Sequence, residues 1–317
     1  MSVHVVVGAS GGIGRAVCAE LARRGLPVRA VSRREPDVPG AENVAADATD
    51  AAAMTRICAG AAAVYHCVNP PFASWRTAFP EATRALLRAA GAAGARFVFA
   101  DDTWMYGRVD GPMREDTPVR PVSEKGVLRA WLAEMVLAAH ARHEVEVVIG
   151  RAPELWGPGV ESLLGAGLFA AASRGATARW PGDPDLPMTA GYAPDVGAAL
   201  VDLALAPTSA TGRVWHTPVP PASTGREFVG RIAATAGRPV RLGRITPAMV
   251  AALRVVSPVA REGAQLLYQF SQPFLVDDAA FRSAFPTTAT SWEEGIAATL
   301  AWYRAEPERT RRRLVPV

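Results

Sequence analysis

The chain has 317 residues, half of them apolar, which is enough for a full hydrophobic core and a second, smaller lobe. No apolar run reaches the length of a transmembrane helix, and the first predicted strand begins near residue 3, so we expect neither a membrane protein nor a signal peptide. The net charge of +4 is spread along the chain. Its one dense basic cluster, at 309–313, is typical of a solvated terminus rather than of a nucleic-acid site.

The three cysteines indicate the compartment. Cys18, Cys58 and Cys67 all fall inside apolar patterns, and no two of them have the spacing of metal ligands. We therefore expect reduced core cysteines, a cytoplasmic protein and no metal site.

The first motif is the segment VHVVVGASGGIG at 3–14, which predicts a buried parallel strand, a glycine turn and then a helix at about 15–24. This order is typical of a pyrophosphate-binding turn. Gly8 permits the tight turn, Gly11 lets the backbone approach the phosphates, and Gly14 lets the helix pack closely on the strand. The unpaired amides at the helix N-terminus then face the anion. The alternative is a glycine turn with a structural role only.

The second predicted strand, 27–32, ends in Ser32-Arg33-Arg34. A site for NAD usually carries an acidic residue here for the ribose 2′-hydroxyl, whereas arginine suits a 2′-phosphate. The absence of an acid favours NADP(H) over NAD(H), unless both arginines are simply solvated.

A short strand at 43–46 leads to Asp47, and either Thr49 or Asp50 is expected to cap the following helix, 51–58. Asp47 is a candidate acceptor for the adenine amine, with a purely local role as the open alternative. The next strand, 63–68, ends in Asn69 and two prolines.

A helix at 76–93 and a strand at 96–100 complete a further strand–helix repeat. Strands that alternate with helices at this spacing predict an α/β fold with a doubly wound parallel sheet of the Rossmann type, whose ligands lie at the carboxyl ends of the strands. We expect the dinucleotide-binding domain at 1–160, completed by about 188–217. A smaller, mainly helical substrate lobe is expected at 161–187 and 218–317.

Polar residues follow the strand at 96–100 and form a candidate active-site wall. Asp102, Thr103 and Tyr106 are candidate catalytic residues, and Trp104 is a candidate substrate contact. The alternatives are a loop cap for Asp102 and a structural corner for Tyr106.

The helix predicted at about 123–143 carries Lys125, the one lysine of the chain, and Arg129. An ammonium can shift its pKa and act in proton transfer where a guanidinium cannot. Lys125 is therefore a candidate both for catalysis and for the cofactor ribose, and Arg129 for substrate binding.

A strand at 145–150 runs into a glycine- and proline-rich turn, 151–159, with Pro153 assigned to the cofactor and Glu154 and Trp156 to the substrate. The segment 162–180 is predicted to be a helix. Tyr192 precedes a helix through residue 205 and is a further substrate candidate, with packing as its alternative.

Four motifs in this order resemble the extended short-chain dehydrogenase/reductases, the family of nucleotide-sugar epimerases and dehydratases. They are the glycine turn at 8–14, the Asp47 turn, FVFADDTWMYG at 97–107, and Tyr192 to Asp195 before a helix. The turn that begins at Arg151 is similar to the family's loop after strand six. The resemblance covers about 200 residues and implies the Rossmann fold, a nicotinamide dinucleotide and a homodimer through the helices flanking the strand at 96–100.

The chain departs from this family in its chemistry. The family places a Ser or Thr after strand five and a Tyr-x-x-x-Lys on the next helix. Alignment with the family pattern puts Asp102 at the serine, Gly126 at the tyrosine and Ala130 at the lysine. Lys125 precedes the tyrosine position by one residue, and Arg129 precedes the lysine position by one residue. A modest rotation of the helix could therefore bring both side chains toward the cofactor.

We consider three functions. The main hypothesis is an NADP-dependent oxidoreductase that reduces a carbonyl or related unsaturated group of a small organic molecule, such as a secondary metabolite, with a non-standard proton donor. The alternatives are a non-catalytic NADP-binding redox sensor and a nucleotide-sugar epimerase or dehydratase. The residues assigned to the cofactor are Gly8, Ser10, Gly11, Gly12, Ile13, Gly14, Ser32, Arg33, Arg34, Asp47, Ala48, Asn69, Lys125 and Pro153.

Overall fold

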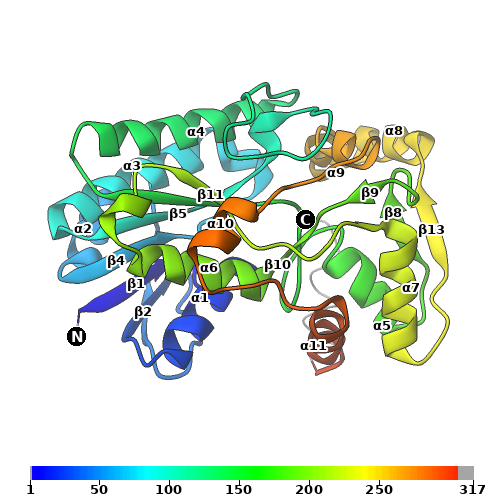
Figure 1. Cartoon of the computed structure of the whole chain (residues 1–317), viewed down its shortest axis with the longest axis horizontal. Helices are drawn as coiled ribbons and strands as arrows, with labels where there is room; N and C mark the ends of the chain where they lie inside the picture. Colours follow the sequence, from blue (N-terminus) through cyan, green and yellow to red (C-terminus); the bar gives the residue numbers. More distant parts are fainter. Residues whose placement is uncertain (1, 306–317) are drawn as a thin grey trace.

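The buried β-branched runs of the sequence pair into one parallel sheet of seven strands, in the order β11-β6-β5-β4-β1-β2-β3 (Figure 1). The computed structural model describes residues 2–305, so the basic cluster expected at 309–313 lies outside the described residues. The expected doubly wound α/β fold is confirmed. The strands are β1 Val3–Val7, β2 Val28–Ser32, β3 Glu42–Ala45, β4 Ala61–His66, β5 Arg96–Asp102, β6 Val147–Ala152 and β11 Val214–His216.

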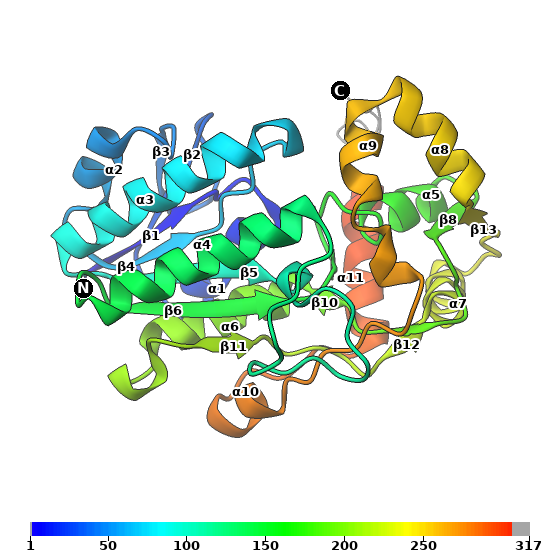
Figure 2. The same ribbon diagram turned by 90° about the horizontal axis from the view of Figure 1, so that it is seen from above.

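Helices cover both faces of this sheet (Figures 1 and 2). One buried cluster joins one face to α2, α3 and α4, and another joins the opposite face to α1 and α6. Apolar side chains are thus removed from water on both sides, as a parallel sheet requires. The helices are α1 Gly12–Arg23, α2 Ala51–Cys58, α3 Trp75–Ala93, α4 Glu124–Ala141 and α6 Ala193–Leu205.

Local capping sets where several helices begin. The Asp50 carboxylate accepts from the Ala53 amide at 2.9 Å at the start of α2, so Asp50 is the N-cap. Ser123 caps α4 by accepting from the Gly126 amide at 3.1 Å. Ser291 caps the last described helix, because Ser291 Oγ accepts from the Glu294 amide at 3.3 Å.

A second lobe carries its own apolar core and lies at one end of the sheet (Figure 2). Its core is rich in aromatic rings, among them Trp156, Phe169 and Phe228. It is built from several helices and three two-stranded pairings. These elements are β7 Leu155–Trp156, α5 Ala171–Ser173, β8 Ala178–Pro181, β9 Pro187–Met188, β10 Gly191–Tyr192, β12 Ser223–Thr224, α7 Gly225–Ala236, β13 Leu242–Ile245, α8 Pro247–Val256, α9 Pro258–Ala264 and α11 Trp292–Ala305. Helix α10 Ala279–Ala284 packs instead on the sheet domain, where Phe281 joins the core formed with α1 and α6.

The helix expected over 162–180 is not formed, and this prediction was wrong. Only two short helical pieces occur there, a π-helical turn at Ala166–Ala170 and α5, before β8 begins. Gly165 is packed so tightly that a Cβ would lie 2.4 Å from the Val160 carbonyl oxygen. Trp180 is drawn into the aromatic core of the lobe by the pairing of β8 with β13.

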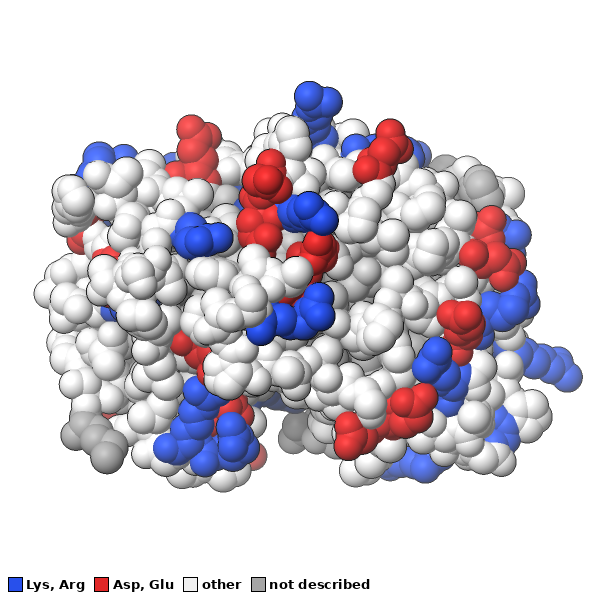
Figure 3. Space-filling model, viewed as in Figure 1, with Lys and Arg blue, Asp and Glu red and all other residues white. Residues whose placement is uncertain are grey.

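Within residues 2–305, none of the helices combines the length and apolar character needed to cross a membrane. Figure 3 shows acidic and basic side chains interspersed on one face of the molecule.

Candidate functional site

The glycine turn after β1 closes tightly against the end of β4. The Gly8 amide donates to the Val31 carbonyl at 2.9 Å, and Gly8 has a φ of 95°, which favours glycine. A Cβ on Gly8 would lie 2.4 Å from the Cys67 carbonyl oxygen, and one on Gly14 would lie 2.2 Å from the Gly8 carbonyl oxygen. Both positions therefore require glycine for packing.

The same turn leaves the N-terminus of α1 accessible. Gly11 is the N-cap of α1 and no side chain caps it, and both Ser10 and Gly11 are exposed. The Ser10 amide donates to Ser32 Oγ at 3.0 Å, which ties the turn to the end of β2. Gly12 and Ile13 are half-buried beside it. Because helix N-terminal amides bind anions, these residues fit the pyrophosphate of a dinucleotide.

The residues assigned to the adenosine half lie at the carboxyl edge of β2 to β4. Arg33 and Arg34 are exposed immediately after β2. Asp47 accepts from the Thr49 amide at 2.9 Å and from Thr49 Oγ1 at 2.8 Å. These two bonds, with a contribution from the charge of Arg33, hold the pKa of Asp47 below its usual range. Ala48 is buried, and Asn69 is exposed after β4.

A cluster of four charged side chains, three of them buried and Asp102 half-buried, lies where β5, β6 and α4 meet. Asp101 Oδ2 accepts from Arg151 Nε at 2.9 Å, and Asp101 Oδ1 lies 3.3 Å from Arg129 Nε. Asp102 Oδ2 lies 2.5 Å from the same Arg129 nitrogen. Because β5 extends to Asp102, two residues beyond the expected end, both aspartates stand on the strand and pair with β6.

Tyr106 belongs to a buried hydrogen-bonded chain. It lies on the short helix η2 (Trp104–Tyr106) and is 1% exposed. Arg151 Nη1 donates to its hydroxyl at 2.7 Å, and that hydroxyl donates to His216 Nε2 at 2.9 Å. His216 Nδ1 in turn donates to the Asp277 carbonyl at 3.0 Å. Burial lowers the pKa of His216, consistent with this neutral tautomer.

Lys125 is buried near the start of α4 and pairs with the second lobe. Its Nζ forms an ion pair with Glu262 Oε2 in α9 at 2.7 Å, and lies 4.2 Å from the centre of the Phe72 ring. Gly126 packs so closely on η2 that a Cβ would lie 2.5 Å from the Trp104 carbonyl oxygen. The backbone of η2 therefore occupies the space in which a tyrosine side chain would begin.

Asp102 and Glu154 are the two carboxyl groups with raised pKa values at this edge of the sheet. Burial raises the pKa of Asp102 to about 6, although Arg129 opposes the rise. Burial also raises the pKa of Glu154 to about 7, and the charge of Asp102 adds to that rise. Both side chains are half-buried. A pair of this kind offers a proton acceptor and a proton donor near neutral pH.

The helical turn η5 (Leu267–Phe270) brings two residues to this site that the sequence analysis did not select. Gln269 Nε2 donates to Glu154 Oε2 at 3.3 Å, and the Tyr268 hydroxyl donates to the Trp104 carbonyl at 3.4 Å. Trp104 is half-buried and stacks on Trp75 with ring centres 5.8 Å apart. No local pattern in the sequence marks this approach of η5 to the end of β5.

The remaining candidates lie in packed surroundings. Thr103 is fully buried, and its Oγ1 has no hydrogen-bond partner among the described residues. Trp156 is fully buried in the core of the second lobe, with its ring centre 4.7 Å from that of Tyr192. Pro153 is buried beside Glu154. Over residues 2–305, His, Cys, Asp and Glu side chains form no group of three that could hold a metal ion.

Comparison with known proteins identifies the family to which the chain belongs. The model of the NAD dependent epimerase/dehydratase family matches residues 4–215. Curated protein sequences gave no match. Among solved structures, the chain is similar to MoeE5 in complex with UDP-glucose and NAD, at 25% identity and a TM-score of 0.78. That alignment covers 97% of this chain and 100% of MoeE5.

Two further solved structures share the fold at lower identity. One is a double mutant of DesIV, a dTDP-glucose 4,6-dehydratase from Streptomyces venezuelae with NAD and DAU bound, at 20% identity and a TM-score of 0.77, covering 99% of this chain and 100% of that chain. The other is a UDP-glucuronic acid 4-epimerase from Bacillus cereus in complex with UDP-glucuronic acid and NAD, at 16% identity and a TM-score of 0.77, covering 96% and 99%. Because the family model matches more than half of the sequence, the chain belongs to the NAD-dependent epimerase/dehydratase family.

Proposed function

We propose that the protein is a nicotinamide-dinucleotide-dependent enzyme of the epimerase or dehydratase kind that acts on a nucleotide sugar, with carboxyl groups in place of the family's tyrosine and lysine. The observation that carries the proposal is that Asp102 and Glu154 stand at the same sheet edge as an intact glycine turn. The substrate class rests on the relatives, since MoeE5 is described in complex with UDP-glucose and NAD. This proposal replaces carbonyl reduction as the main hypothesis.

The chain's own residues suggest how protons would move. A nicotinamide dinucleotide held at the glycine turn would supply the hydride chemistry, which leaves the protein to supply a proton acceptor for the substrate hydroxyl. With a pKa of about 6, the Asp102 carboxylate is mostly ionised at pH 7 and can accept that proton. Glu154, with a pKa of about 7, remains partly protonated and can return one.

We propose NADP(H) rather than NAD(H) as the preferred cofactor, although the relatives named above bind NAD. Two exposed arginines, Arg33 and Arg34, follow β2, and no acidic residue ends that strand. The guanidinium groups can pair with a 2′-phosphate, whereas an acid would be needed to bind the 2′-hydroxyl in the usual way.

A non-catalytic NADP-binding sensor remains the second candidate. It is favoured because Gly126, which aligns with the family's tyrosine, packs so closely against the Trp104 carbonyl that no side chain fits there. A sensor would bind the reduced cofactor and convert no substrate.

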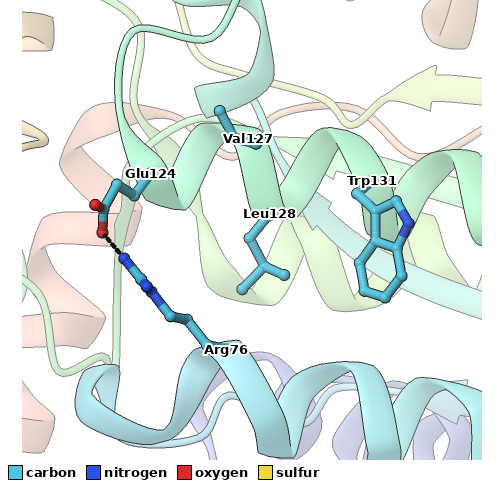
Figure 4. Close-up of a pocket in the computed structure, with 5 residues that line it drawn as sticks. All are labelled: Arg76, Glu124, Val127, Leu128 and Trp131. Atoms are coloured by element: carbon cyan, nitrogen blue, oxygen red, sulfur yellow. Dashed lines mark hydrogen bonds and ion pairs between the residues drawn. The ribbon is translucent and has the colours of Figure 1, made fainter.

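We also propose a homodimer and a cytoplasmic location. Val127 and Trp131 project from one face of α4 and are 55% and 41% exposed. With Leu128, Arg76 and Glu124 they line a shallow hollow of about 340 Å³ between α3 and α4 (Figure 4). A second copy of the chain would cover this apolar face. All three cysteines are free, as expected for a reducing compartment.

The test combines binding with product analysis. NADPH and NADH are titrated separately by nicotinamide fluorescence, and the NAD(P)⁺-loaded protein is then incubated with UDP-glucose, UDP-glucuronic acid and dTDP-glucose. New sugars are detected by NMR, and loss of water is detected by mass spectrometry. Asp102→Asn should abolish turnover while cofactor binding persists, and the exposed Asp110→Asn is the matched control. Cofactor binding without conversion of any substrate would favour the sensor.

A further inference from the structure

An acceptor-rich cluster, consisting of Asp102, Glu154 and Gln269, lies where the ends of β5 and β6 meet the second lobe. Asp102 is the last residue of β5 and pairs in register with Ala152, which lies two residues before Glu154. Gln269 reaches the same place from η5 and donates through Nε2 to Glu154 Oε2 at 3.3 Å. The charge of Asp102 also contributes to the raised pKa of Glu154, in accord with this strand register.

The cluster holds more acceptors than donors. Gln269 is 1% exposed, and its Oε1 has no hydrogen-bond partner among the described residues. Within this cluster Gln269 Nε2 donates to Glu154, and the two oxygens of that carboxyl group can accept further hydrogen bonds. A buried acceptor without a donor is costly, so this oxygen and the Glu154 carboxyl group would gain from a ligand that donates N–H groups.

The cationic side chains of this region are already neutralised. Arg129 lies against Asp101 and Asp102, and Arg151 pairs with Asp101. Lys125 pairs with Glu262. The cluster therefore presents acceptor oxygens and no unpaired cation, which disfavours a phosphate or carboxylate at this point.

A divalent metal ion is a less suitable ligand than a donor group. Within residues 2–305 there is no group of three His, Cys, Asp or Glu side chains that could hold one. An ammonium or amine needs only two or three acceptors and forms charge-assisted hydrogen bonds with carboxylates.

We infer that the cluster of Asp102, Glu154 and Gln269 binds an amino group of the substrate, so that the protein takes an amino sugar rather than a fully hydroxylated one. This inference rests on the proposed function, because it names the substrate class of the same site. Glu154 and the Gln269 oxygen accept N–H bonds from the amine, and Asp102 faces the neighbouring hydroxyl-bearing carbon.

The test compares matched ligands by calorimetry on the NAD(P)⁺-loaded protein. One pair differs at C2, UDP-glucosamine against UDP-glucose, and a second differs at C4, dTDP-4-amino-4,6-dideoxyglucose against dTDP-6-deoxyglucose. In one of the two pairs, the amine should bind at least about tenfold more tightly than its hydroxyl counterpart. Glu154→Gln should reduce that preference to within about twofold, and the exposed Glu81→Gln should leave it intact. Equal binding within both pairs by the wild-type protein would overturn the inference, whatever the variants do.

UDP alone and free sugars separate the inference from the proposed function. If UDP binds but neither pair shows an amine preference, the amino-group inference fails and the nucleotide-sugar proposal stands. If UDP does not bind, the nucleotide-sugar proposal fails. D-glucosamine against D-glucose then decides the inference: an amine preference that is lost in Glu154→Gln supports it, and the lack of one overturns it.

Discussion

At the scale of single residues, a carboxyl group at position 102 changes what the end of β5 can do. The resemblance places a serine or threonine hydroxyl there, which orients a substrate but does not take its proton at neutral pH. Asp102 has a pKa of about 6 and is held by Arg129 at 2.5 Å, so it is both ionised and fixed in position at pH 7. Under the proposed function, Asp102 accepts the proton that the missing tyrosine accepts in the family.

Glu154 predicts a distinct dependence of stability on pH. Its pKa of about 7 in the folded protein lies above the usual glutamate pKa of 4.5, so the folded state binds more protons than the unfolded state between these two pH values. The free energy of unfolding should consequently fall as pH rises from about 4.5 to about 7. Glu154→Gln lacks this titrating group. Between pH 5 and pH 8 its free energy of unfolding should therefore fall by about 1–2 kcal/mol less than that of wild type.

Urea unfolding of wild type and Glu154→Gln at pH 5 and pH 8 measures this effect. Glu81→Gln, on the exposed face of α3, is the control for a general loss of negative charge. If the free energy of unfolding changes by the same amount between pH 5 and pH 8 in wild type and in Glu154→Gln, burial of the Glu154 carboxyl group does not make stability depend on pH.

The arginines after β2 allow a test of cofactor choice. Arg33→Ala combined with Arg34→Ala should weaken NADPH binding by at least about tenfold and NADH binding by less than about twofold, because only NADPH carries the 2′-phosphate. Fluorescence titration with both cofactors gives the two ratios. Equal weakening of both would exclude the arginines as the source of cofactor preference.

The sequence predicts some residues of this site and not others, for a physical reason. Asp102 and the glycine turn follow directly from local patterns, since strand ends and glycine turns are marked by their own residues. Gln269, Tyr268 and Glu262 reach the site through long-range packing of the second lobe, which no short pattern encodes. For the same reason the sequence shows that Lys125 is the one lysine but not that it pairs with α9.

At the scale of elements, the turn between β1 and α1 contains two glycines, Gly11 and Gly14, that differ in how closely their surroundings are packed. Gly11 has a φ of −78°, and a Cβ there would lie 3.3 Å from the Gly8 carbonyl oxygen, a contact that needs only a small adjustment. A Cβ on Gly14 would lie 2.2 Å from the same oxygen, which the backbone cannot accommodate without moving. Packing within the fold therefore requires glycine at position 14, whereas at position 11 only the proposed ligand would require it.

Two alanine variants test this difference. Gly11→Ala should unfold within about 0.5 kcal/mol of wild type but bind the cofactor at least about tenfold more weakly. Gly14→Ala should lose about 2–3 kcal/mol of stability through overpacking. Chemical denaturation and cofactor titration are measured on both. A Gly11→Ala protein with undiminished cofactor binding would contradict the assignment of this turn to the pyrophosphate.

The incorrect prediction of a helix over 162–180 shows which elements cannot be predicted from local sequence patterns. Its apolar residues have no strand-like alternation, so periodicity favours a helix. The structure instead inserts β8 there, because Ala178–Pro181 finds a parallel partner in Leu242–Ile245, more than sixty residues later. In the sheet domain β1, β3, β4 and β5 are each followed along the chain by a helix that packs on the sheet, and the strands and helices predicted there are formed.

At the scale of the whole molecule, the apolar face of α4 is the feature that the fold leaves uncovered. The buried side of this helix packs on the sheet through Leu132 and Val136. Its outer side exposes Val127 and Trp131, one helical turn apart, and Val122 is exposed just before the helix begins (Figure 4). In a monomer these side chains would remain in water, so the proposed homodimer has a physical reason beyond the family resemblance.

Trp131→Glu combined with Val127→Glu should convert the dimer to a monomer, because two symmetry-related copies would bring four carboxylates together in an apolar contact. Sedimentation velocity should show a fall to the monomer mass with an unchanged circular dichroism spectrum. Val255→Glu, on α8, removes an even more exposed apolar side chain from another surface and should leave the mass unchanged. If wild type already sediments as a monomer at tens of micromolar, α4 is not the dimer interface, and its exposed face must be explained by another partner.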